Sequence, residues 1–256
     1  ISKNEIMQII SLAEKIKKQP KKYYQKLKDK TLLMLFVKPS LRTHISFDVA
    51  MYKLGGHSIF YDLSNSPLGK KESMKDRAIV MSSYVDIIMS RLFEHKDMQL
   101  LAKHSKVPVI SGLDNQEHPC QILGDLLTIK EKLKNLKGLS LTYIGDANNN
   151  VTHSLIYGCS KIGMNVAISC PKNKEFMPNP EIVQKAKKQS NAKISIIHNP
   201  KKAVENADII YSDSWQSYHI SDSQMKRRIQ ILKPYQVNSK LFSLNKKMLF
   251  MHCLPE

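Results

Sequence analysis

Short continuous apolar runs alternate along this chain with segments that have the apolar spacing of a helix. Residues 31–37 form one such run, which predicts a strand buried on both faces of a parallel sheet. The next segment has apolar residues at i, i+3, i+4 and i+7, namely Phe47, Ala50, Met51 and Leu54. This spacing predicts a helix with one buried face, and the pair Gly55-Gly56 predicts where that helix ends.

The same alternation continues through the first half of the chain and begins again in the second half. Helices are predicted at residues 5–19, 72–84 and 151–162, and strands at residues 58–62, 86–90, 107–110, 139–144, 166–169, 194–197, 208–211 and 248–251. Alternating strands and helices are typical of parallel α/β sheets. Residues 118–134 have the spacing of a long helix with no obvious partner strand before it, which predicts a bridge between two domains.

The predicted fold class is therefore α/β with two domains, each a parallel sheet flanked by helices, joined by a long bridging helix. We place the first domain at residues 1–121, the bridging helix at 122–137 and the second domain at 138–256. A chain of 256 residues is long enough for one or two ordinary domains.

Composition narrows the class of protein. No apolar run approaches the roughly 18 residues of a membrane-spanning helix. The polar, lysine-rich residues 1–22 lack the apolar core of a signal peptide. The four cysteines show no Cys-x-x-Cys spacing, which argues against a metal site or a disulfide framework and fits a reducing compartment. We therefore expect a soluble, cytoplasmic protein with no bound metal and no membrane partner.

The net charge of +18 raises nucleic-acid binding as an alternative. Only five of the 40 basic residues are arginine, and the lysines are spread along the chain. We interpret most of this charge as a solvated lysine-rich surface and expect no specific nucleic-acid partner. A positive field also attracts anionic substrates.

Candidate chemistry begins where the first buried strand gives way to a helix, at Phe36-Val-Lys-Pro-Ser-Leu-Arg-Thr-His44. A helix that begins directly after a strand presents backbone N–H groups and its positive dipole end to an anion. Ser40 and Thr43 add hydroxyl donors, and Arg42 adds a planar guanidinium suited to phosphate. An ordinary junction with a Ser or Thr cap has the same pattern, so both interpretations stay open on this segment alone.

Further polar residues follow other predicted strands or begin helices. Arg91 directly follows the strand at 86–90, and ligands bind at the carboxyl ends of strands in open α/β sheets; taken alone, Arg91 could also be a surface charge. His118-Pro-Cys-Gln121 begins the long helix with proline in its first turn, so His118 and Gln121 can reach one ligand.

Three polar segments follow strands of the second half: Gly145-Asp-Ala-Asn-Asn-Asn150, Asp213-Ser-Trp-Gln-Ser217 and Met251-His-Cys-Leu-Pro255. Asparagine is common in turns without any function, and Trp215 can simply pack. Cys253 is either a buried, inert thiol or part of a site. A carboxylate at position 213 is suited to hold a cationic amino acid.

Together these segments resemble the motifs of the aspartate/ornithine carbamoyltransferase family, in the family's order and over nearly the whole chain. Lys38-Pro-Ser-Leu-Arg-Thr43, followed by Ser46-Phe47 and Leu54-Gly-Gly-His57, resembles the family's carbamoyl-phosphate loop. The segments at 118–121, 145–150, 213–217 and 252–255 resemble its His-Pro-x-Gln, Gly-Asp-x-Asn-Asn, Asp-x-Trp-x-Ser and His-Cys-Leu-Pro motifs, with matches to the ornithine branch.

The resemblance implies carbamoyl transfer from carbamoyl phosphate to the δ-amine of L-ornithine, giving citrulline and phosphate in arginine metabolism. The implied catalytic residues are Arg42, Arg91, His118 and Cys253. The implied carbamoyl-phosphate-binding residues are Ser40, Leu41, Arg42, Thr43, Arg91, His118, Gln121, Cys253 and Leu254. The implied ornithine-binding residues are Asn150, Asp213, Ser217 and Tyr218. In this scheme Cys253 lies beside the attacking amine and is not a nucleophile.

The resemblance further implies no metal or organic cofactor and a homotrimer or a multiple of trimers, with the loop at 65–71 reaching a neighbour's site. Pro67 stands where relatives usually carry Gln or His, and Tyr218-His219 replace Met-Gly. These differences leave two alternatives: a carbamoyltransferase for another amine such as putrescine, or a catalytically weakened homologue. Relatives continue beyond His-Cys-Leu-Pro with an arginine and terminal helices, so we expect a fragment or a partly ordered chain.

Overall fold

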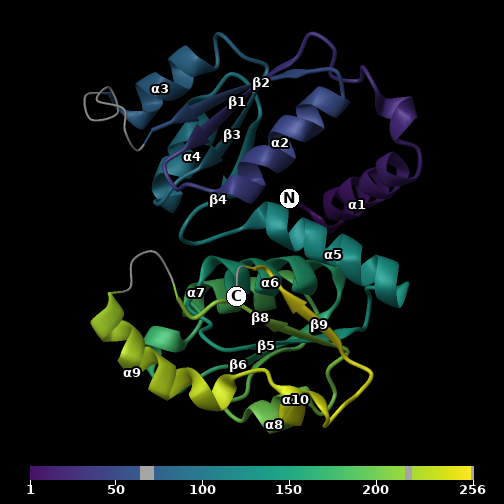
Figure 1. Ribbon diagram of the computed structural model, residues 1–256, viewed down its shortest axis with the longest axis vertical. Helices are drawn as coiled ribbons and strands as arrows, with labels where there is room; N and C mark the ends of the chain where they lie inside the picture. Colours follow the sequence, from purple (N-terminus) through teal and green to yellow (C-terminus); the bar gives the residue numbers. More distant parts are fainter. Residues whose placement is uncertain (64–71, 217–220, 255–256) are drawn as a thin grey trace. The chain divides into compact units, whose positions relative to one another are not determined.

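A computed structural model describes residues 1–63, 72–216 and 221–254 of the chain (Figure 1). The chain divides into two compact units. We call Ser11–Cys120 the N-terminal unit, and Ile1–Ile10 together with Gln121–Glu256 the C-terminal unit. The sequence-based boundaries, with a bridging helix at 122–137, stay a prediction.

The N-terminal unit contains a parallel sheet of four strands in the order β2-β1-β3-β4. Its strands are β1 (Thr31–Phe36), β2 (His57–Asp62), β3 (Ile87–Arg91) and β4 (Val109–Leu113). Its helices are α2 (Leu41–Lys53), α3 (Met74–Met81), α4 (His95–His104) and the short 3-10 helix η1 (Pro20–Tyr23). The predicted strands of this half are confirmed, whereas α4 was not predicted from the sequence.

Strand β1 is covered by helices on both of its faces. Leu32, Met34 and Phe36 pack in a cluster with α2, while Leu33 and Leu35 pack with α3 and α4. Because side chains alternate along a strand, a strand buried on both faces needs apolar residues at every position. This arrangement explains the continuous apolar run and confirms the prediction made from it.

Helix α2 ends where the glycine pair predicts. Gly55 has a φ of +83°, and a Cβ at this position would lie 2.8 Å from the Cα of Gln25. A larger residue would therefore be both strained and too close to the neighbouring backbone. The predicted buried face is only partly correct, because Met51 is buried but Ala50 is exposed. Contact of α2 with the sheet is made mainly through Phe47 and Met51.

The C-terminal unit contains a parallel sheet of five strands in the order β7-β6-β5-β8-β9. Its strands are β5 (Ser140–Ile144), β6 (Asn165–Ser169), β7 (Ile194–Ile196), β8 (Ile209–Ser212) and β9 (Leu249–His252). The helices of this half are α5 (Pro119–Leu133), α6 (Asn150–Ile162), α7 (Pro180–Gln189), α8 (Pro200–Val204), α9 (Asp222–Leu232), α10 (Ser239–Phe242), η3 (Lys174–Phe176) and η4 (Lys233–Tyr235). The predicted strands and the helix ending at Gly163 are confirmed.

The sheet of the C-terminal unit also has apolar cores on both faces. One core joins strands β5, β6 and β8 to helices α5, α6 and α7, and it includes Ile6 and Ile10 of α1 (Lys3–Lys18). The other core places residues of β5 and β8 against α8 and α10. Figure 1 shows α6 and α7 on one side of this sheet and α8 and α10 on the other.

Each sheet contains a point where the chain reverses the direction in which it adds strands. After β1 the chain adds β2 on one side and then β3 on the other; after β5 it adds β6 and β7 on one side and then β8 and β9 on the other. Ligands in open α/β sheets bind at the carboxyl ends of strands beside such a point. The two expected binding regions are therefore the ends of β1 and β3, and the ends of β5 and β8.

Candidate active site

Ser40 organises the loop between β1 and α2. Its backbone is extended, and its Oγ accepts a hydrogen bond of 3.3 Å from the N–H of Thr43 and donates one of 3.1 Å to the Thr43 hydroxyl. This N-cap satisfies one first-turn N–H and fixes where the others emerge. Leu41 and Arg42 are both exposed in this first turn, so an anion can approach the N-terminus of α2.

Arg91 lies at the carboxyl end of β3, beside the end of β1, and pairs in register with Phe36. Its Nη1 donates a hydrogen bond of 2.7 Å to the hydroxyl of Thr43. The side chain is nearly buried, with 6% of the residue exposed. A guanidinium held with so little water favours an anionic ligand. The structure therefore brings Ser40, Thr43 and Arg91 together, while the carbamoyl-phosphate-binding role implied for them stays a prediction.

His118 follows a tightly held loop. The buried carboxylate of Asp114 accepts hydrogen bonds of 2.8 Å from the N–H groups of Gln116 and Glu117, and its other oxygen lies 2.8 Å from Nδ1 of His95. Burial, then the charges of Arg91 and Lys38, lower the pKa of His118 to about 4. The imidazole is therefore neutral at pH 7 and can donate one N–H. Asp114 was not identified from the sequence.

Gln121 belongs to the C-terminal unit, in the first turn of α5. Its Nε2 donates a hydrogen bond of 3.0 Å to Asp125, whose second oxygen accepts a hydrogen bond of 3.0 Å from the Tyr211 hydroxyl. Burial raises the pKa of Asp125 to about 6, although both hydrogen bonds act in the opposite direction. Sequence analysis did not identify Asp125, although a carboxylate on the apolar face of a helix was a usable signal.

Asp213 and Cys253 meet at the carboxyl ends of β8 and β9. The Cys253 thiol donates a hydrogen bond of 2.8 Å to Oδ1 of Asp213, and the N–H of Ser214 donates one of 2.7 Å to the same oxygen. Burial, then the charge of Asp213, raise the pKa of Cys253 well above its usual range. The thiol therefore stays protonated, which argues against a thiolate nucleophile because the thiolate is the reactive form.

Leu254 has a left-handed backbone with a φ of +56°, which is uncommon for a residue with a large side chain. Its N–H donates a hydrogen bond of 2.9 Å to Nδ1 of His252. Strained backbone positions of this kind gather at functional sites. The carbamoyl-binding role assigned to Leu254 stays a prediction.

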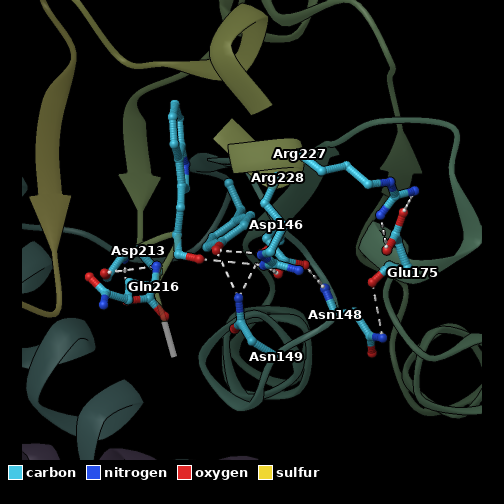
Figure 2. A network of polar contacts seen from close by, with 11 residues as sticks. Asp146, Asn148, Asn149, Glu175, Asp213, Gln216, Arg227 and Arg228 are labelled. Carbon is cyan, nitrogen blue, oxygen red and sulfur yellow. Dashed lines mark hydrogen bonds and ion pairs between the residues drawn. The ribbon is translucent and has the colours of Figure 1, made fainter. Parts of the chain in front are cut away.

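The three asparagines at 148–150 have different structural roles, and Figure 2 shows the contacts of Asn148 and Asn149. Asn148 donates a hydrogen bond of 3.2 Å to the Glu175 carbonyl. Asn149 caps α6 by accepting a hydrogen bond of 2.8 Å from Thr152, and its amide donates to the Tyr143 hydroxyl and the Asp146 carbonyl. Asn150 is the first residue of α6, and the ornithine-binding role implied for it stays a prediction.

Ser217 and Tyr218, two of the predicted ornithine-binding residues, lie outside the described residues, as do His219 and the loop at 65–71 with Pro67. Among the residues that are described, no group of three or more His, Cys, Asp or Glu side chains could hold a metal ion. In the same ranges, no helix is both long and apolar enough to cross a membrane.

The fold and these groups define an α/β protein of two units, each with polar groups at the carboxyl ends of its parallel strands. The N-terminal unit is equipped for an anion, through a helix N-terminus and a buried arginine. The C-terminal unit offers a carboxylate and an amide at its switch point, a set suited to a cationic amino acid.

Comparison with known proteins gives the family. The family model for the carbamoyl-phosphate-binding domain of aspartate/ornithine carbamoyltransferase matches residues 1–131, and the model for its Asp/Orn-binding domain matches residues 137–256. The chain therefore belongs to the aspartate/ornithine carbamoyltransferase family, and the resemblance noted in its motifs is confirmed.

Similar proteins cover nearly all of the chain. It is 42% identical to the ornithine carbamoyltransferase of Methanocaldococcus jannaschii, over 100% of this chain and 84% of that protein. It is 45% identical to that of Methanobrevibacter smithii, over 99% of this chain and 84% of that protein. The structure of the ornithine carbamoyltransferase from Pyrococcus furiosus matches with a TM-score of 0.93 and 39% identity, over 100% of this chain and 82% of that one. The predicted fold class is confirmed.

Proposed function

We propose that this protein transfers the carbamoyl group of carbamoyl phosphate to the δ-amine of L-ornithine, forming L-citrulline and phosphate. The main observation behind the proposal is that one unit offers positive donors to an anion, whereas the other offers a carboxylate to a cation. Arg91 and the N-terminus of α2 form an anion site in one unit, and Asp213 provides a carboxylate in the other. The similar proteins reported above are ornithine carbamoyltransferases, which supports ornithine as the acceptor.

The phosphate of the donor binds at the first turn of α2. The N–H groups of this turn, the hydroxyls of Ser40 and Thr43 and the side chain of Arg42 supply the donors. An anion at a helix N-terminus is stabilised by both the orphan N–H groups and the helix dipole. These groups also stabilise the phosphate as it leaves with the electron pair of the broken C–O bond.

The carbonyl of the carbamoyl group is polarised by Arg91, Thr43 and His118. Attack by the amine forms a C–N bond and places negative charge on the carbonyl oxygen. Donors fixed in advance stabilise that charge without reorganising during the reaction. Because the pKa of His118 is about 4, the ring acts as a neutral hydrogen-bond donor and not as a general acid. Gln121, Cys253 and Leu254 hold the carbamoyl nitrogen.

Ornithine binds through Asp213, Asn150 and Ser217, with Tyr218 near it. In the described residues, both hydrogen bonds to the Asp213 carboxylate end on Oδ1, which leaves Oδ2 for the ammonium of the amino acid. The δ-amine must be neutral to attack, and as the C–N bond forms it loses one proton, which the departing phosphate takes up. Holding the amine close to the carbonyl supplies much of the rate enhancement. No metal or organic cofactor takes part in this scheme.

The proposal is tested by measuring citrulline and phosphate together in a mixture of carbamoyl phosphate and ornithine. We expect one citrulline for each phosphate released above the background hydrolysis of the donor. Arg42→Ala should lower kcat/KM by a factor on the order of a hundred, while Arg77→Ala on α3 should change it little. Phosphate release without citrulline, or equal rates for the two variants, would contradict the proposal.

We also propose that the protein assembles as a homotrimer or a multiple of trimers. Helix α2 and the edge strand β2 expose apolar side chains, which a second copy of the chain could cover: Ile45, Val49, Tyr52, Ile59 and Phe60. Exposed apolar groups of this extent mark interaction surfaces. Light scattering should give three protomers, and replacing Ile45 and Val49 by lysine should give monomers. Unchanged mass in that variant would exclude this surface.

We place the protein in the cytoplasm, where its reaction serves arginine metabolism. All four cysteines are free thiols, and two of them, Cys159 and Cys170, are buried within the C-terminal unit. Free thiols persist in a reducing compartment.

A further inference from the structure

Two adjacent arginines on α9 are unusual in this chain. Only five of its 40 basic residues are arginine, and Arg227 and Arg228 are two of those five. Arginine differs from lysine in presenting a planar fork of donors that can satisfy more than one acceptor.

Arg228 joins two loops of the C-terminal unit, as Figure 2 shows. Its Nη2 donates to Oδ2 of Asp146, in the loop after β5, and makes a longer contact of 3.5 Å with the carbonyl of Trp215, in the loop after β8. Its guanidinium also lies 5.0 Å from the ring centre of Phe176. Both side chains of the ion pair are largely buried, with 14% of each exposed.

Both loops carry residues of the proposed ornithine site. In the first loop, Asp146 also accepts a hydrogen bond of 3.0 Å from the N–H of Asn148, and its carbonyl accepts from the amide of Asn149. Asn149 in turn caps the helix that begins with Asn150. In the second loop, Trp215 lies two residues after Asp213. Arg228 thus connects the surroundings of both ligand-binding groups without touching either of them.

Arg227 provides a natural comparison on the same helix. It forms two hydrogen bonds with the Glu175 carboxylate, of 3.0 Å and 2.7 Å. These side chains are exposed to 59% and 39%, and exposed pairs contribute little. Among the described residues, neither Arg227 nor Glu175 has a hydrogen bond or ion pair with the loop after β8. The two arginines therefore share the same chemistry but differ in burial and in the loops that they contact.

We propose that Arg228 is a positioning residue, which holds the loops after β5 and β8 together so that Asn150 and Asp213 keep the geometry needed to bind the amino-acid substrate. The inference rests on the proposed function for the identity of that substrate. The loop connection itself does not, because it can be measured in the protein without substrate. Lysine at position 228 keeps the charge but loses the planar fork, so it should weaken the connection without removing a positive charge.

The first readout is the fluorescence of Trp215, the only tryptophan of the chain. Its indole nitrogen lies close to Gly145, 3.5 Å from where a Cβ would stand, so the ring reports on both loops. In Arg228→Lys without substrate, we expect the indole to become more accessible to acrylamide quenching. Arg227→Lys, the matched control, should quench like the wild type. Equal quenching in all three proteins would overturn the proposed connection, whatever the reaction turns out to be.

The second readout separates binding from chemistry. With saturating carbamoyl phosphate, Arg228→Lys should raise the KM for ornithine on the order of tenfold, with a smaller change in kcat. With saturating ornithine, its KM for carbamoyl phosphate should equal that of the wild type. Asp146→Asn removes the negative partner of the ion pair and should reproduce this pattern. This variant replaces Arg228→Lys in the test if Arg228→Lys folds poorly. Equal loss for both substrates, or an effect as large in Arg227→Lys, would overturn the positioning role. If the wild type forms no citrulline while Arg228→Lys still alters quenching, the proposed function fails and the loop connection stands.

Discussion

The guanidinium of Arg91 donates a hydrogen bond of 2.7 Å to the hydroxyl of Thr43, which ties the carboxyl end of β3 to the first turn of α2. The same hydroxyl accepts from Ser40, the residue that caps α2. Three of the proposed donors, Ser40, Thr43 and Arg91, are therefore held together by hydrogen bonds within the protein. Preorganised donors of this kind usually provide the largest electrostatic contribution to catalysis.

Replacing Arg91 by lysine tests this connection. Lysine keeps the charge, but its compact ammonium group lacks the planar fork of donors with which the guanidinium reaches Thr43. We expect kcat/KM to fall by a factor on the order of a hundred, with little change in thermal stability. Arg77→Lys on α3 is the control and should keep wild-type kinetics. Wild-type kcat/KM in Arg91→Lys would show that the planar fork is not needed.

Cys253→Ser tests whether the thiol is a nucleophile. The serine hydroxyl can donate to Asp213 as the thiol does, so we expect kcat to stay within about tenfold of the wild type. Cys253→Ala removes the donor and should lower kcat further. A loss on the order of a million-fold in the serine variant, as when a covalent nucleophile is removed, would contradict direct displacement.

Asp213→Asn tests whether the C-terminal unit binds ornithine while the N-terminal unit binds carbamoyl phosphate. The substitution keeps an oxygen to accept from Ser214 and Cys253 but removes the negative charge. We expect calorimetry to show ornithine binding weakened on the order of tenfold to a hundredfold, with carbamoyl phosphate binding nearly unchanged. Equal weakening of both ligands would mean that Asp213 supports the protein generally and does not bind the amine.

Asp125 should make stability depend on pH in a particular direction. The pKa of Asp125 is about 6 in the folded protein and 3.8 in an unfolded chain, so the folded protein binds the proton more tightly. The stabilising effect is complete below pH 3.8 and is lost as the pH rises through about 6. Relative to Asp125→Asn, the wild type should lose on the order of 3 kcal/mol across this range.

Urea unfolding at a series of pH values would measure this difference. Using the difference between the two proteins cancels the titration of all other groups that they share. A difference that does not change with pH would show that folding leaves the pKa of Asp125 unchanged, and a change in the opposite direction would show that folding lowers this pKa.

The strand–loop–helix units were predictable because their causes are local. The apolar run of β1, the cap at Ser40 and the glycines after α2 each act within a few residues, and the polar ends of the strands then predict the binding regions. Asp125 and Arg228 were not predicted, because each has a partner that is distant in sequence. Asp114 was not predicted either, although two of its partners, Gln116 and Glu117, are local. Tyr211, which donates to Asp125, lies 86 residues away from it, and Asp146 lies 82 residues from Arg228.

The central claim is that the carbamoyl group of carbamoyl phosphate is transferred to ornithine. Reaction rates with a panel of amines test this claim most directly. Ornithine, putrescine, N-acetylornithine and aspartate would each be supplied at equal concentration with saturating carbamoyl phosphate, and the carbamoylated product measured. Because we propose that Asp213 binds the α-ammonium group of ornithine, we predict that ornithine has the highest kcat/KM, by on the order of a hundredfold or more over the other three. A higher kcat/KM for any other amine, or no product from ornithine, would contradict the account.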